Sequence, residues 1–313
     1  MEKHTVSASL TDNTKYMNRA LPVKKSFDII ERNLIIGGQN SAFYFIDGFT
    51  KDETMLKLMD SFLNISADDM PEDATSFSTS CIPYVEVDIF GDFDSIFKNI
   101  LSGVTCLFID GYEAAIAIDC RTYPSRSIEE PDKDKSLRGS RDGFVETIVF
   151  NTALMRRRIR DPHLIMEMYE AGTSTRTDVA LCYMSDRVDR ELLTTIQNKL
   201  EESKSQDLKM SQQSLAESLF QRKWYNPFPK YKFTERPDTA CACLMEGKVI
   251  LLTDTSPSAL ILPTSIFDMI EEANDYYFPP ITGIYLKISR VLISLLTVFM
   301  AVSYTHLTLP TIA

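Results

Sequence analysis

The side chains best suited to catalysis or metal binding are few in this sequence, and their spacing is poor for either role. Only three histidines occur, and only His163 lies outside the two chain ends. One such histidine leaves little for a histidine-based metal site or a Ser-His-Asp triad. No two of the six cysteines have C-x-x-C spacing, and Cys241 and Cys243 lack the second pair that a zinc site needs. The sequence therefore predicts a protein that is not an enzyme and that holds no metal or cofactor.

The strongest chemical signal is a basic cluster between residues 121 and 160. This stretch carries ten Lys and Arg against six Asp and Glu, although the whole chain has a net charge of −11. Two interpretations stay open. The arginines at the end of a helix could stabilise the negative end of its dipole and pair with an acidic surface. They could also bind an anion, a lipid headgroup or another subunit, because guanidinium bonds carboxylate and phosphate bidentately. The candidate interface between subdomains or subunits consists of Arg138, Arg141, Arg156, Arg157, Arg158 and Arg160.

A glycine-bearing loop precedes this helix, with the sequence RGSRDG over residues 138–143. Backbone N–H groups at a helix N-terminus can hold an anion. The loop lacks the Lys-Ser/Thr pair of a P-loop at the required offset, so it is a weak phosphate site. We expect the loop to act with the helix as part of the interface.

Composition and periodicity indicate an α/β fold. Apolar residues make up 44% and charged residues 25% of the 313 residues, which is ordinary for about two globular domains. The acidic balance argues against nucleic-acid binding. Strands and helices alternate in both halves, which predicts two small mixed-sheet α/β subdomains joined by a helix that begins near Asp142 and ends at Asp161. Expected strands cover 34–36, 42–46, 84–89, 104–109, 114–118, 164–169, 179–184, 249–252 and 259–262, and expected helices cover 50–63, 92–100, 189–200, 211–220, 237–245 and 266–270.

The expected boundaries divide the chain into six parts. Residues 1–26 are polar and without period, so we expect a disordered tail there. The abruptly Thr-rich residues 302–313 fit neither neighbouring pattern, and we expect a non-native read-through tail. The parts between them are an N-terminal α/β subdomain (27–125), a charged loop and linker helix (126–161), a second α/β subdomain (162–277), and an incomplete amphipathic or first transmembrane segment (278–301).

The apolar C-terminal segment has two interpretations. Residues 281–302 carry only two charges, Lys287 and Arg290, both in the first half. The uncharged part, 291–302, falls short of the roughly 20 residues needed to cross a bilayer. The segment could be a buried core helix. It could also be an amphipathic helix leading into an incomplete transmembrane span, with Lys287 and Arg290 at the cytoplasmic membrane interface.

The run from Arg138 to Asp161, RGSRDGFVETIVFNTALMRRRIRD, closely resembles the signature of the GerA family, the A subunits of bacterial spore germinant receptors. Similar segments in the family's order are AFYFIDGFTKDE (42–53), LFIDGYEAAIAIDCRTYPSR (107–126), TRTDVALCYM (175–184), FTERPD (233–238) and LMEGKVILLTDTSPSALILPTS (244–265). NPFP (226–229) and DYYFPP (275–280) are more similar to the family's stage V sporulation protein AF branch, so the branch stays open.

The resemblance implies a cytoplasmic N-terminal region that precedes a membrane domain in the spore inner membrane. It implies B and C subunits as partners, a nutrient bound by the B subunit, and an A subunit that forms a homo-oligomeric ion channel through its membrane domain, in contact with lipid. The AF branch would instead provide accessory ion release. The rival interpretation is a soluble α/β ligand-binding module in which 281–301 is a core or interface helix.

Overall fold

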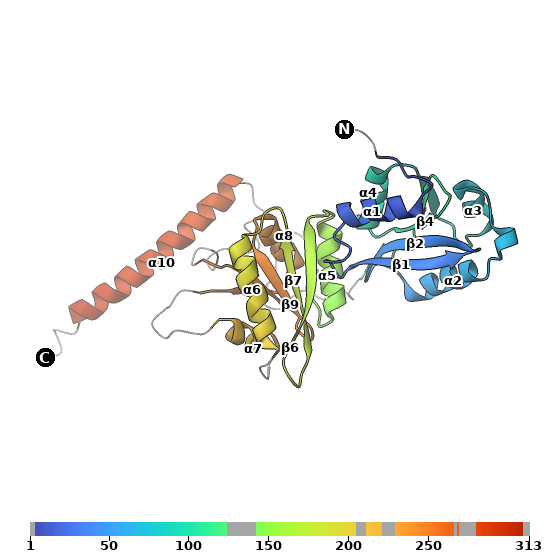
Figure 1. Ribbon diagram of the computed structural model, residues 1–313. Helices are drawn as coiled ribbons and strands as arrows, with labels where there is room; N and C mark the ends of the chain where they lie inside the picture. The colour runs from blue at the N-terminus through green and yellow to red at the C-terminus, as the bar shows by residue number, and fades with distance from the viewer. Residues whose placement is uncertain are drawn as a thin grey trace.

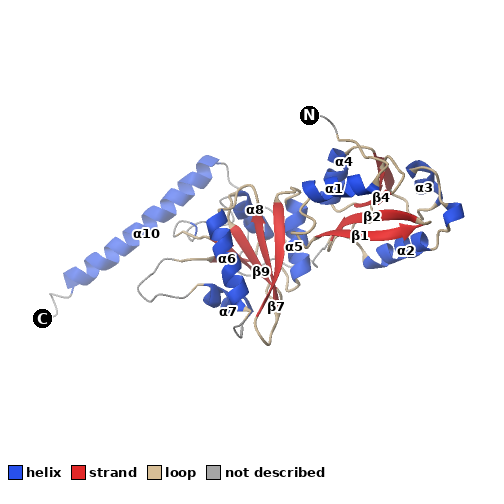
Figure 2. Cartoon of the chain, in the orientation of Figure 1, coloured by secondary structure: helices blue, strands red, loops and turns tan. Residues whose placement is uncertain are grey.

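Two five-stranded sheets, each flanked by helices, form two subdomains that lie side by side, and a long helix extends away from the second (Figures 1 and 2). The computed structural model describes residues 4–123, 142–204, 211–220, 229–265, 268 and 280–308. The prediction of two α/β subdomains joined by a helix is confirmed. The expectation of mixed sheets is wrong, because every strand pair described is antiparallel.

The first subdomain has the strand order β1-β2-β4-β5-β3. Helices α1 and α4 cover one face of the sheet, and α2 and α3 cover the other, so the strands are buried between two apolar clusters. A two-residue turn, Gly37-Gly38, with both φ angles positive, joins β1 to β2. Its elements are α1 (Leu10–Ala20), β1 (Ile29–Ile36), β2 (Gln39–Ile46), α2 (Asp52–Leu63), a 3-10 turn (Ala67–Asp69), α3 (Ala74–Ser80), β3 (Val87–Phe90), α4 (Phe93–Leu101), β4 (Thr105–Ile109) and β5 (Ala115–Ile118).

The predicted disordered tail over residues 1–26 is wrong for the described residues, because α1 belongs to the core. Met17 is fully buried and Leu21 nearly so, and both pack in the cluster under α4. The segment looks polar because a helix covering one corner of a sheet needs only a few apolar positions. Ser9 caps the helix through its side chain, which accepts from the Asp12 N–H.

The second subdomain repeats this arrangement, with the strand order β6-β7-β9-β10-β8. Helices α5 and α8 cover one face, and α6 and α7 the other. The predicted linker helix begins only at Ile148, and residues 142–147 are not helical. The expected helix 266–270 lies outside the described residues except for Asp268. The elements are α5 (Ile148–Arg158), β6 (Leu164–Ala171), β7 (Thr177–Met184), α6 (Arg190–Ser203), α7 (Ser211–Leu219), β8 (Lys232–Thr234), α8 (Pro237–Met245), β9 (Val249–Thr253) and β10 (Ala259–Leu262).

The same side-chain contact holds the start of α1 and the start of α5. Asn13 donates to the Ser7 carbonyl at 2.6 Å and accepts from the Ser7 N–H at 2.9 Å. Asn151 donates to the Val145 carbonyl at 2.6 Å and accepts from the Val145 N–H at 2.8 Å. Helix α5 is therefore the counterpart of α1, placed 138 residues later in the chain.

The ends of β4 and β9 complete this equivalence. Asp110 accepts a hydrogen bond from the Leu10 N–H at 2.8 Å, and Asp254 accepts one from the Ile148 N–H at 3.1 Å. Each carboxylate thus satisfies a free N–H group at the start of its helix. Since the shared strand order and these shared contacts recur together, the two subdomains are built as a structural duplication.

Helix α10 (Pro280–Thr308) contributes no residue to the hydrophobic cluster of either subdomain. Its segment Ile281–Tyr304 has 24 residues with a mean hydropathy of 1.8, and none of its most apolar window is buried. By length and composition it could cross a membrane. The interpretation of this segment as a buried core helix is wrong. The helix includes residues 302–308 of the expected read-through tail, and residues 309–313 lie outside the described part.

Candidate functional site at the subdomain junction

Arg156 connects the two subdomains from a fully buried position on α5. Its Nε donates to Asp28 Oδ2 at 2.6 Å, and its Nη2 lies 3.2 Å from Asp28 Oδ1. Asp28 precedes β1 in the first subdomain. The same guanidinium donates to the carbonyls of Asp161 at 3.1 Å and Leu164 at 2.9 Å. These two hydrogen bonds fix the turn that connects α5 to β6. Both charged groups, the Arg156 guanidinium and the Asp28 carboxylate, are shielded from water. The stability of the ion pair therefore depends on these hydrogen-bond partners.

The segment beside Asp28 adds main-chain contacts to the same junction. Ser26 Oγ donates to Asp28 Oδ1 at 2.5 Å and accepts from the Met166 N–H at 3.0 Å. The Phe27 N–H donates to the Met166 carbonyl at 3.0 Å, and the Phe27 ring packs against the core of the second subdomain. The turn segment ahead of β1 therefore contacts the free edge of β6 at Met166, through one main-chain and one side-chain hydrogen bond.

Helix α5 also packs closely on the turn after β2. A Cβ atom on Gly48 would lie 3.1 Å from Ala153 Cβ and 3.2 Å from Val149 Cγ1, and the φ of Gly48 is +77°. Only glycine tolerates both the conformation and the approach. Arg157 lies with its guanidinium carbon 4.4 Å from the centre of the Tyr123 ring, at the end of the first subdomain. This is cation–π geometry across the junction.

The structure places the other predicted arginines apart from this junction contact. Arg158 pairs with Asp142 at 3.2 Å, just upstream of its own helix. Arg160 Nε reaches the Arg157 carbonyl at 3.4 Å and is exposed. Arg138 and Arg141 lie outside the described residues. Thus Arg156 and Arg157 contact the first subdomain, whereas the ion pair of Arg158 with Asp142 and the hydrogen bond of Arg160 to the Arg157 carbonyl lie within one stretch of chain.

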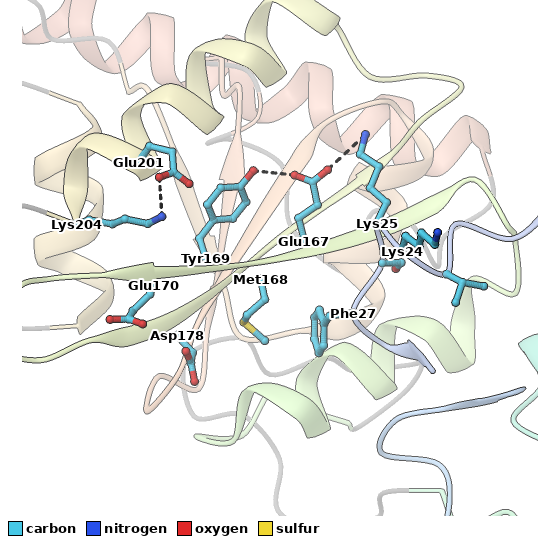
Figure 3. A pocket seen from close by; sticks show the side chains of 12 residues that line it. Lys24, Lys25, Phe27, Glu167, Met168, Tyr169, Glu170, Asp178, Glu201 and Lys204 are labelled. Atoms are coloured by element: carbon cyan, nitrogen blue, oxygen red, sulfur yellow. Dashed lines mark hydrogen bonds and ion pairs between the residues drawn. The ribbon is translucent and has the colours of Figure 1, made fainter. Parts of the chain in front are cut away.

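A polar groove of about 700 Å³ runs beside the junction and is lined by both subdomains (Figure 3). Lys24 and Lys25 come from the chain before β1, and Glu167 and Tyr169 come from β6. Lys204 lies across the groove, paired with Glu201 at 2.6 Å. Charges of both signs meet here in a partly solvated space.

Glu167 is the best-bonded group of the groove. It accepts from Tyr183 Oη at 2.6 Å, Tyr169 Oη at 2.7 Å and Gln197 Nε2 at 2.8 Å, and Lys25 Nζ lies 3.4 Å away. Burial alone would raise the pKa of this carboxyl, but the three hydrogen bonds and Lys25 outweigh it and lower the pKa. The folded protein therefore favours the ionised form.

We expect Glu167→Gln to reduce the loss of unfolding free energy that the protein shows as the pH falls below about 5. The lowered pKa means that the folded state binds the Glu167 proton more weakly than the unfolded chain. Its stabilisation is therefore complete above about pH 5 and is lost as the pH falls through the folded-state pKa. Urea unfolding between pH 7 and pH 3 measures the effect. The exposed neighbour Glu170, replaced by Gln, is the control, and equal slopes for both variants would contradict the assignment.

Comparison with known proteins agrees with this architecture. The sequence profile described as "Bacillus/Clostridium GerA spore germination protein" matches residues 15–310. The chain belongs to the GerA family. Stage V sporulation protein AF of Bacillus subtilis is 33% identical over 91% of this chain and 58% of its own length, and spore germination protein KA of the same organism is 28% identical over 92% and 53%. The chain thus spans about half the length of these curated relatives.

The fold of this GerA-family chain also has a solved counterpart. The crystal structure of the N-terminal domain of the A subunit of the Bacillus megaterium spore germinant receptor GerK3 superposes with a TM-score of 0.62. The alignment covers 84% of this chain and 98% of that domain at 22% identity. The expected two-subdomain fold of the family is thereby confirmed.

Five of the six cysteines of this GerA-family chain are buried as core residues, and Cys81 is half-buried. Burial raises the pKa of the Cys241 thiol to about 12 and that of Cys243 to about 11, so both stay protonated at neutral pH. Among the residues that the structure describes, no group of three or more His, Cys, Asp or Glu is placed to hold a metal ion.

The first-subdomain residues that meet α5, namely Asp28, Gly48 and Tyr123, were not predicted from the sequence. Each looks like ordinary turn or loop chemistry in the sequence. One available signal was the pattern N-T-x-x-M-x-R-x-L/I, which occurs at residues 13–21 and again at 151–159. This repeat would have marked the first copy as a helix of the same kind and the region before β1 as folded.

Proposed function

We propose that this chain is the region preceding the membrane domain of a GerA-family germination protein, acting as a non-enzymatic subunit of a nutrient-germinant receptor in the spore inner membrane. The family match supports the class, and the name of the relative spore germination protein KA supports the process. The observation that carries the mechanism is the buried Arg156–Asp28 pair, which ties α5 to both subdomains.

In this mechanism the two subdomains act as one body. A B or C subunit that contacts the body differently with and without nutrient would shift the equilibrium of the attached membrane domain. Homo-oligomers would form through that membrane domain, and ion release would follow its opening. Contacts such as Arg156 with Asp28 and Arg157 with Tyr123 transmit displacement because they leave little freedom between the halves.

Helix α10 supplies the membrane attachment in this proposal. Lys287 and Arg290 are three residues apart and therefore lie on one side of the helix, near its start. We assign them to the cytoplasmic lipid interface, with the apolar residues after them in the bilayer.

We expect the chain to float with anionic phospholipid vesicles in a density gradient. The pair Leu296→Lys and Phe299→Lys should release it, since each central charge costs about 2.5–3.5 kcal/mol of insertion free energy. The matched control is Tyr285→Lys near the interface, which should leave flotation unchanged. Flotation that survives the double substitution would contradict attachment through α10.

The coupling role predicts different effects for two adjacent arginines. In the complete protein, Arg157→Glu should abolish or strongly delay nutrient germination, because it replaces the cation over Tyr123 with a carboxylate. Arg158→Glu is the control, because its described partner, Asp142, lies on its own side of the junction. Germination is measured by the fall in spore optical density, with protein levels checked by immunoblot. Normal germination of Arg157→Glu spores at normal protein level would refute the coupling role.

A second candidate is the accessory ion-release role of the stage V sporulation protein AF branch, favoured by the 33% identity to that protein. Deletion of the gene separates the two. Loss of the response to one nutrient supports the receptor subunit, whereas slower germination with every nutrient supports the accessory role.

A further inference from the structure

The structural duplication also repeats the surfaces that meet at the junction. Helix α5 lies between the two subdomains, and the end of the first subdomain covers its outer face (Figure 1). Helix α1 packs in the core of the first subdomain, and its matching face is exposed at Lys15 and Arg19. Counting from the equivalent Asn13 and Asn151, the residues of the two faces match pairwise, Ala153 with Lys15, Arg156 with Asn18 and Arg157 with Arg19.

The second subdomain carries a counterpart of the end that covers α5. In the first subdomain the Asp47 N–H, just after β2, donates to the Asp28 carbonyl at 2.8 Å. In the second subdomain the Ser185 N–H, just after β7, donates to the His163 carbonyl at 2.9 Å. The two turns are therefore equivalent, and His163 takes the place of Asp28. The side chain of His163 is 55% exposed, so this end is open to solvent.

At the closest contact of the junction, both members have counterparts of opposite charge. A Cβ atom on Gly48 would lie 3.1 Å from Ala153, so the junction leaves no room for larger side chains there. The matching residues are Asp186, which follows Ser185 in its turn, and Lys15 on α1. Both are exposed. Where the junction has two small residues in contact, the two open surfaces therefore carry a carboxylate and an ammonium group that can form an ion pair.

The buried ion pair of the junction also has a complementary counterpart. Asn18 takes the place of Arg156, as His163 takes the place of Asp28. His163 Nδ1 lies 2.8 Å from Asp161 Oδ1, which leaves Nε2 as a hydrogen-bond acceptor when Nδ1 donates. The side-chain amide of Asn18 is a donor for that nitrogen. The open face of α1 and the open end of the second subdomain thus match at two positions.

We propose that the outer face of α1 binds the end of the second subdomain of another copy of this chain, as α5 binds the end of the first subdomain within the chain. Lys15 of one copy pairs with Asp186 of the next, and Asn18 bonds to His163. Each copy uses two different surfaces, so the contact is heterologous and continues from copy to copy, closing into a ring if the rotation allows. This contact is separate from assembly through the membrane domain and does not depend on which germination role the chain has.

Sedimentation velocity of the full chain in detergent measures this self-association. Lys15→Asp and Asp186→Lys should each weaken it at least tenfold, because each brings like charges together. The chain that carries both substitutions should associate again, since the two surfaces have then exchanged their charges. Lys57→Asp is the matched control and should have no effect, because Lys57 lies exposed on α2, away from both surfaces.

Disulfide cross-linking identifies the two surfaces directly. Copies with Lys15→Cys are mixed with copies with Asp186→Cys, both with Cys81→Ser because the other five cysteines are buried. Oxidation should link one kind of copy to the other, and neither kind to itself. Lys57→Cys in place of Lys15→Cys should give no link. A chain that stays monomeric, copies that link to their own kind, or association that survives Lys15→Asp unchanged, as contact through α10 alone would, overturns the proposal.

Discussion

Replacing Arg156 with methionine is expected to destabilise the chain by about 3–5 kcal/mol, because it leaves the Asp28 carboxylate buried without its counter-charge. The side chain of Arg156 is fully buried and that of Asp28 is 2% exposed, so water cannot replace the lost partner. The carbonyls of Asp161 and Leu164 lose their donors in the same step. Urea unfolding followed by circular dichroism measures the loss as a shift of the midpoint.

The double variant Arg156→Met with Asp28→Leu separates charge burial from lost packing. Removing both charges should recover part of the stability, since a buried ion pair is often replaceable by apolar side chains. Arg158→Met is the matched control and should cost less than about 1 kcal/mol, because its ion pair with Asp142 is exposed. A double variant no more stable than Arg156→Met would show that the stranded carboxylate is not the cause.

Gly48→Val should have the second largest effect, at about 3–5 kcal/mol. The position has a φ of +77°, which costs an L-residue about 1–2 kcal/mol and a β-branched residue more. The new side chain would also meet Val149 and Ala153 at 3.1–3.2 Å, and overpacking of this kind costs about 1–3 kcal/mol. In the complete protein the same change should impair germination, because it forces α5 away from the first subdomain.

Gly111→Val is the control for backbone strain alone. Gly111 has a φ of +91°, and a Cβ there would meet nothing within 4 Å. The difference in unfolding free energy between the two variants therefore measures the close approach of α5. Ala153→Gly should offset part of the cost of Gly48→Val, whereas in Gly111→Val it should only add its own helix cost of about 1 kcal/mol. Equal destabilisation of both glycine variants, without rescue, would remove the contact as the explanation.

Most elements of this fold were predictable because their signals are local. Strand β4 is a continuous apolar run, and α4 carries its apolar residues at helical spacing after the cap Asp92. The helix at 237–245 and the hairpin strands β9 and β10 were found in the same way. Helix α1 was missed because Leu10 and Met17 are its only buried apolar residues, so its periodic signal is weak.

The candidate site was predictable in part. The density of arginine marked the right helix, yet it gave Arg156 and Arg158 equal weight. In the folded protein Arg156 is fully buried against Asp28 and Arg158 lies at the surface. The two are two positions apart on a helix, so they point in different directions, and only the placement of the first subdomain decides which one is covered.

The amino-acid sequence established the fold class, the family and the apolar C-terminal segment, because composition, periodicity and long collinear motifs are properties of the chain alone. The antiparallel pairing of both sheets and the contacts of the junction became evident only in the folded chain, and the fold gave meaning to the short repeat at 13–21 and 151–159. Asp28 and Arg156 are 128 residues apart, and nothing local relates them. They meet because α5 packs on the turn at Gly48, and that packing requires both sheets to be formed.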